Sequence, residues 1–227
     1  MKPSWKRSGA RRFHALVSRV VRVVLVGLAS GLIACAGLPD KPVRAVLYDF
    51  GPGTSDQAPP NTSAAWSGQA LVLGDIEAPG AWDQTSMHYR LAYADARVLH
   101  AYAFGRWAMP PAQLLRQHLR AELARGRAVV AAVDAPALAT QVEHQGLRLE
   151  ILEFSQVFDA PDRSAGLVRL QATALRLKGG AEQFQGQRVF EARAPSGSAD
   201  AAGGALALAT AATQLARDLD AWLRSLP

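Results

Sequence analysis

The sequence predicts a single α+β domain in which two amphipathic helices pack on a largely antiparallel sheet. Short segments in which apolar residues alternate or form compact runs, bounded by Pro, Gly and polar residues, predict the strands. Two longer segments repeat their apolar residues every three or four positions and predict the helices. The chain has 227 residues, of which 49% are hydrophobic, so it can bury the core of one such domain.

The first part of this domain predicts four strands and a loop. Between the first two strands, residues 54–68 are rich in Ser, Pro, Asn, Gln and Ala, a composition that predicts a mobile loop. The last two strands are joined by a short turn at Asp95-Ala96 and are expected to form a hairpin. The predicted strands are residues 43–50, 70–76, 88–93 and 98–104.

A helix is predicted from Pro110-Pro111 to about Arg125, because proline fits the first turn of a helix. Three leucines at i, i+4 spacing form its inward stripe: Leu115, Leu119 and Leu123. Basic residues on this helix and just beyond it could attract anionic headgroups, or they could simply form its solvated face. They are Arg116, Arg120, Arg125 and Arg127.

The second part predicts four more strands and a closing helix. Within the third of these strands the inward-facing parity changes between Ala174 and Leu175, which predicts a bulge near Ala174. The predicted strands are residues 128–133, 147–158, 167–177 and 183–194. The closing helix is marked by apolar residues at alternating spacings of four and three, Leu208, Ala212, Leu215, Leu219, Trp222 and Leu226. The order of elements also suggests two similar βββα halves, although no sequence repeat relates them.

The positive charge of the chain is concentrated before Cys35. Seven basic residues and no acidic residue precede it, so 18 basic and 19 acidic residues remain from Cys35 onward, although the whole chain carries +6. The basic character therefore belongs to the leader, and the sequence predicts no nucleic-acid partner. The seven residues are Lys2, Lys6, Arg7, Arg11, Arg12, Arg19 and Arg22.

The start of the chain has the layout of a bacterial secretory signal. The basic region is followed by the apolar run Val23–Leu32 and then by Leu32-Ile33-Ala34-Cys35, which resembles a lipobox. We therefore predict a signal peptide over residues 1–34, lipidation of the single cysteine Cys35, and a lipidated spacer over residues 35–42 that precedes the domain at 43–227. The lipid would hold the protein at a membrane surface.

An uncleaved transmembrane anchor is the alternative for this segment. The uninterrupted apolar stretch from Val23 ends near Leu38, short of the roughly 20 residues that a spanning helix needs, which favours lipidation. Ala36 follows the cysteine, and the sorting rule for proteobacterial lipoproteins then predicts the outer membrane over the inner membrane, with the domain facing the periplasm.

Residues for catalysis or metal binding are not predicted. The five histidines show no metal-ligand spacing, there is no Gly-x-Ser-x-Gly elbow, and the pair Gly179-Gly180 is not followed by Lys-Ser or Lys-Thr. His88 and His100 could face each other across the hairpin, or they could be ordinary half-exposed strand residues. Glu150 and Glu153 are separated by an odd offset on one strand and are expected to point to opposite faces. We therefore expect no enzyme activity, no metal and no cofactor.

The chain resembles the ABC-type transport auxiliary lipoproteins, the periplasmic companions of transporters that contain mammalian-cell-entry-domain proteins and move lipids between the two membranes. The resemblance covers nearly all of the mature chain but gives no counterpart for the loop 54–68. It rests on Tyr48-Asp49-Phe50-Gly51, Asp75–Pro79, His88–Tyr93, Tyr102–Leu115, Leu149–Phe158 and Trp222-Leu223.

This resemblance implies a non-enzymatic accessory lipoprotein, whose partners are a mammalian-cell-entry-domain protein and its permease and ATPase. It carries over one functional residue, the lipidated Cys35, and the sequence leaves a homo-oligomer open. The alternative function is a stand-alone periplasmic lipid- or ligand-binding lipoprotein, which predicts a roomy apolar cavity in place of a filled core.

Overall fold

The computed structural model describes residues 44–52, 69–138 and 142–227, which belong to one structural unit over residues 44–227. The predicted signal peptide, the lipidated spacer and the predicted loop 54–68 lie outside the described residues.

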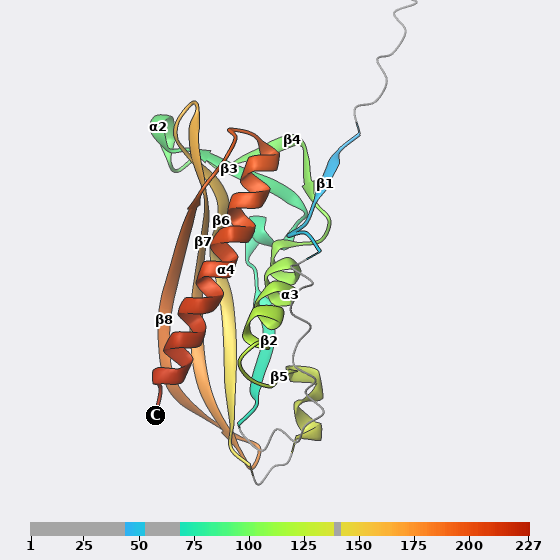
Figure 1. Ribbon diagram of the computed structural model, residues 1–227, viewed down its shortest axis with the longest axis vertical. Coiled ribbons are helices and arrows are strands. Elements are labelled where there is room, and N and C mark those ends of the chain that lie inside the picture. Colours follow the sequence, from blue (N-terminus) through green and yellow to red (C-terminus); the bar gives the residue numbers. More distant parts are fainter. Residues whose placement is uncertain (1–43, 53–68, 139–141) are drawn as a thin grey trace, which may run out of the picture. The chain divides into compact units, whose positions relative to one another are not determined.

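The strands of the described residues form one mixed sheet (Figure 1). Its order is β1-β4-β3-β6-β2-β5, and β7 and β8 continue from β6. The two longest ladders, β6–β7 and β7–β8, are antiparallel, whereas β1–β4, β2–β5, β2–β6 and β3–β6 are parallel. The strands are β1 (Val46–Tyr48), β2 (Leu71–Glu77), β3 (Ser86–Leu91), β4 (His100–Trp107), β5 (Val129–Ala131), β6 (His144–Ala160), β7 (Arg163–Lys178) and β8 (Ala181–Pro195).

Strand β6 connects the two parts of the sheet. β2 pairs with its first half and β3 with its last residues, while β7 runs along most of its length. β6, β7 and β8 form a continuous meander, but β2 and β3 each pair with β6 and not with each other. The two predicted halves therefore share an order of elements but not a pattern of pairing. The predicted β3–β4 hairpin is confirmed.

The two predicted amphipathic helices are present as α3 (Pro111–Leu123) and α4 (Ala201–Ser225), and the α+β prediction is confirmed. α4 begins before Leu208, where the predicted apolar pattern starts, because its first turns contain mostly Ala and Gly and show no spacing of large apolar residues. The Asp200 carboxylate caps α4 by accepting a hydrogen bond from the Gly203 backbone N–H at 2.8 Å. None of the helices in the described residues is long and apolar enough to cross a membrane.

Three short helical segments complete the fold: η1 (Gly80–Asp83), α2 (Ala92–Asp95) and η2 (Ala132–Ala137). Two of them correct the predicted strand ends. Residues 92–93 belong to α2 and residues 132–133 to η2, because apolar alternation alone does not distinguish the end of a strand from a following turn.

The core lies between the sheet and the two long helices, which cover the same face (Figure 1). We call this the helix face and the opposite side the outer face. α4 approaches β7 so closely at Gly166 that an added Cβ would lie 2.5 Å from the Leu208 backbone nitrogen. The largest fully buried core side chains include Trp107, Phe154, Leu115, Leu119, Leu170, Leu208 and Leu215.

The bulge predicted near Ala174 of β7 lies on the neighbouring strand, β8. β7 pairs regularly with β6 through Ala174 and Leu175, and the extra residue is Gln185 on β8. Leu175 and Leu177 therefore keep their places on the outer face, opposite Gly146 and His144 of β6. Their apolar character marks a change in what covers that face.

Candidate interaction surface

The only predicted functional residue, Cys35, lies outside the described residues, so its lipidation stays a prediction. Within the described ranges, no group of three His, Cys, Asp or Glu residues is arranged to hold a metal ion. His88 and His100 lie on adjacent strands, with His100 opposite Tyr89, one residue along from His88. Each ring contacts an aromatic side chain, His88 that of Trp82 and His100 that of Tyr89.

The prediction that Glu150 and Glu153 point to opposite faces is wrong. Glu150 pairs with Gln171 and Glu153 with Arg169, and these two β7 residues share a face because they are two positions apart. β6 accommodates this by inserting Leu152 as an extra residue, so an odd offset returns to the same side. The bulge brings the Glu153 carboxylate onto the outer face.

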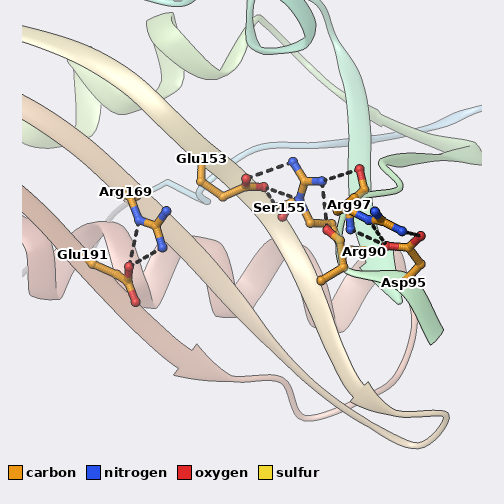
Figure 2. Close-up of polar contacts among 8 residues, drawn as sticks. Arg90, Asp95, Arg97, Glu153, Ser155, Arg169 and Glu191 are labelled. Atoms are coloured by element: carbon orange, nitrogen blue, oxygen red, sulfur yellow. Dashed lines mark hydrogen bonds and ion pairs between the residues drawn. The ribbon is translucent and has the colours of Figure 1, made fainter. Parts of the chain in front are cut away.

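Glu153 forms a bidentate ion pair with Arg90 of β3 (Figure 2). The Arg90 Nε and Nη2 atoms lie 3.1 and 3.0 Å from the two carboxylate oxygens, and the Ser155 hydroxyl donates to one of them. Nη1 donates to the backbone carbonyls of Ala96 and Arg97, just after α2. The side chains of Arg90 and Glu153 are only 20% and 11% exposed. This pair therefore fastens α2 and β3 to β6 and is occupied by structural contacts.

Two titratable side chains nearby are held neutral. Burial, followed by the positive charge of Arg90, lowers the pKa of His88 below its ordinary value. Burial also raises the pKa of Tyr102 well above its ordinary value, and its hydroxyl donates to the Gln156 side-chain oxygen at 2.7 Å. Burial therefore favours the uncharged form of both groups.

Three cross-strand ion pairs lie on the outer face of β6, β7 and β8. Arg169 and Glu191 are 2.6 Å apart and are shown in Figure 2. Two further pairs, Arg193–Asp159 and Arg148–Glu182, also have nitrogen–oxygen distances of 2.6 Å. All are substantially exposed, which is typical of a surface in contact with water.

The basic residues predicted on α3 and beyond are largely ion-paired as well. Arg116 pairs with Asp75, Arg125 with Glu122 at 3.1 Å, and Arg127 with Asp220 at 2.9 Å. Because carboxylates already neutralise three of the four arginines, this row favours the solvated-face interpretation over a site for anionic headgroups.

An exposed apolar patch lies where β1 meets β4. β1 is the last strand at one end of the sheet and pairs on one side only within the described residues, through Val46 to Gly105 and Leu47 to Arg106. Val46, Leu47 and Phe104 are 52%, 67% and 54% exposed. β1 contains neither Pro nor a charged residue, the usual means of blocking an edge. We call β1 together with Phe104 the β1–β4 edge.

The sequence did not predict this edge as a surface. An apolar run in a strand indicates a buried strand, and nothing in the sequence shows that this strand lies at the end of the sheet. Its chemistry suits another protein chain. A free strand edge offers backbone hydrogen bonds, and exposed apolar side chains beside it offer area to bury.

Two solved structures resemble this domain in fold. Protein XCC0632 from Xanthomonas campestris is 20% identical, with a TM-score of 0.55, over 82% of this chain and 88% of its own. A second solved structure, of an uncharacterized protein, is 15% identical, with a TM-score of 0.53, over 79% of this chain and 99% of its own. Both likenesses confirm the fold. None of the curated proteins matches the chain significantly.

The family comparison reaches further than the fold. A family model described as the ABC-type transport auxiliary lipoprotein component matches residues 48–220, which include strands β2 to β8, helix α3 and most of helix α4. The match confirms the resemblance seen in the sequence: the chain belongs to the ABC-type transport auxiliary lipoprotein component family.

Proposed function

We propose that this auxiliary lipoprotein serves an ABC-type lipid transport system and links its mammalian-cell-entry-domain component to the outer membrane. The family match over residues 48–220 carries the proposal, since the family is an auxiliary component of ABC-type transport. The lipobox-like Leu32-Ile33-Ala34-Cys35 and the following Ala36 support a lipid anchor and export to the outer membrane.

The β1–β4 edge is the docking site in this proposal. Leu47 lies opposite Arg106 of β4, and Phe104 is two residues before Arg106 on the same strand, so the two exposed side chains belong to one edge of the sheet. The Arg106 guanidinium is held by the backbone carbonyls of Tyr102 and Gly105, at 2.6 and 2.8 Å, and so stays back from the patch. A partner strand can pair with β1 while its side chains cover the apolar pair.

Substitution of Phe104 tests the docking site. Phe104→Lys places a charge within the patch. An unpaired charge in the core of an interface weakens binding, so this variant should recover about tenfold less of the mammalian-cell-entry-domain protein, or less still, in a membrane pull-down. Phe184→Lys is the matched control, because Phe184 is an equally large, 64% exposed side chain on β8. Equal recovery with both variants would exclude the edge, and no recovery with the unsubstituted protein would exclude the partner.

The anchor is tested separately at Cys35. Cys35→Ala should abolish labelling with radioactive palmitate and release the protein from the outer-membrane fraction, because the thiol is the attachment point of the lipid. Persistence of both labelling and fractionation would contradict the anchoring proposal.

The alternative of a stand-alone lipid-binding lipoprotein predicts a roomy apolar cavity within the fold. Instead, the space between the sheet and the long helices is filled by buried side chains such as Trp107, Phe154 and Leu208. The filled helix face favours the accessory function over an internal lipid carrier.

A further inference from the structure

The outer face is apolar near the turn that joins β7 to β8, in contrast to the ion-paired region farther along these strands. Leu175 and Leu177 lie there on β7, next to Gly146 of β6 and near Val72 of β2. Val72 is buried but does not belong to the helix-face core, because its side chain points to the other side of the sheet from Leu71 and Leu73. These residues form a second apolar layer, on the opposite side of the sheet from the helix-face core.

The segment η2 lies over this layer and leaves a groove beneath it. The groove has a volume of about 300 Å³ and is lined mainly by small and aliphatic side chains. The apolar lining comprises Val72, Ala132, Ala135, Leu138, Val142 and Leu177.

The rim of the groove carries one ammonium group that is not ion-paired within the described residues, that of Lys178. Lys178 and Glu182 both border the groove, but Glu182 is paired with Arg148 at 2.6 Å. Lys178 makes no ion pair with any residue that the structure describes, and it is exposed. An anionic group on a ligand could therefore reach an ammonium at the mouth of an aliphatic groove.

We propose that the groove between η2 and the outer face binds one aliphatic chain of an anionic lipid, with Lys178 beside the headgroup. Its described lining is mainly small and aliphatic, with the His144 ring beside it, which favours a flexible aliphatic chain over a ring system. Its volume is at the lower limit for ligand sites, which suits one chain better than two. This site goes beyond the proposed function, because docking through the β1–β4 edge needs no bound lipid.

Photolabelling of the full-length lipoprotein in phosphatidylcholine vesicles tests the site. The probe is palmitate with a diazirine near its methyl end, and unlabelled palmitate is the competitor. We expect adducts on peptides from η2 and from residues 175–182, lost when the competitor is added. Adducts spread over other peptides, or insensitive to the competitor, would overturn the proposal.

Variants make this test specific. Ala135→Trp should fill the groove and lower labelling at least tenfold, and Val142→Trp should do the same from another wall, so that misfolding of one variant leaves the test intact. Ala121→Trp, at an exposed position on α3, is the matched control and should label normally. Full labelling of both groove variants would exclude the site.

The headgroup contact is tested with Lys178→Glu. This variant should weaken palmitate labelling about tenfold, but should leave labelling by a diazirine lysophosphatidylcholine, which has no net charge, within about twofold. Equal loss with both probes would show that Lys178 does not recognise the anionic group. Failure of any of these tests would leave the Phe104→Lys pull-down result unaffected, so the two proposals can be separated.

Discussion

The two faces of the β6–β7–β8 meander are held by different interactions. On the helix face, Val168, Leu170 and Ala172 are fully buried against α4. On the outer face, the neighbouring residues of β7 include Arg169, which is paired with the exposed Glu191. Buried apolar area dominates folding free energy, whereas exposed ion pairs contribute little. The helix face therefore determines the fold, and the outer face is free to serve as a surface.

The close approach of α4 to β7 at Gly166, on the helix face, should show the largest effect. Gly166→Ala should lower the free energy of unfolding by about 3 kcal/mol, because the new Cβ would overlap the backbone of Ala207 and Leu208 and force α4 away from the sheet. Urea denaturation measures this change. Gly197→Ala is the control, since an added Cβ meets no atom within 4 Å there, and equal effects of the two variants would contradict close α4 packing.

The next effect is expected at the well-buried Arg90–Glu153 ion pair of the outer face. Arg90→Met should cost about 2 kcal/mol, because it leaves the Glu153 carboxylate without its bidentate partner and frees the carbonyls after α2. Adding Glu153→Met should recover most of this loss, since two apolar side chains leave no buried charge. A double variant as unstable as Arg90→Met would show that the carboxylate is not the cause.

The two faces can also be distinguished by pH. Burial lowers the pKa of His118, which lies between α3 and α4 within 2.9 Å of the Thr213 hydroxyl, and burial likewise lowers the pKa of His88 on the outer face. A folded-state pKa below the ordinary 6.5 means that the unfolded chain binds more protons. The stabilisation is present above about pH 6.5 and is lost as the pH falls through the folded-state pKa.

Denaturation at pH 7.5 and pH 5.0 measures this contribution. The unsubstituted protein should lose stability at the lower pH, His118→Gln should lose less, and the double variant with His88→Gln should lose least. Unchanged pH dependence in the double variant would exclude both histidines as its source.

The sequence predicted the elements that depend on local pattern. α3 was recognisable from Pro110-Pro111 and its leucine stripe, and the β3–β4 hairpin from two alternating strands around a short turn. The start of α4 was missed, because Ala and Gly near residue 201 give no amphipathic signal.

The sequence did not predict which distant strands pair with each other, and it did not predict the β1–β4 edge. The partner of Glu153 is Arg90, 63 residues away, and the two meet only because β3 pairs with β6 and Leu152 forms a bulge. Likewise, the exposure of Leu47 depends on the position of β1 at the end of the sheet, which no local pattern encodes. The apolar pattern does change parity at Leu175, but the cause is the apolar layer under η2 and not a bulge in β7.

The smallest effect is expected for the exposed pairs of the outer face. Arg169→Gln combined with Glu191→Gln should change the free energy of unfolding by no more than about 0.5 kcal/mol, because both side chains are nearly half exposed and water replaces the lost contact. Urea denaturation beside Gly166→Ala makes the comparison direct, since Arg169 lies only three residues along the same strand. A loss comparable to that of Gly166→Ala would mean that the outer face helps to hold the fold, and that it is not simply a surface free for recognition.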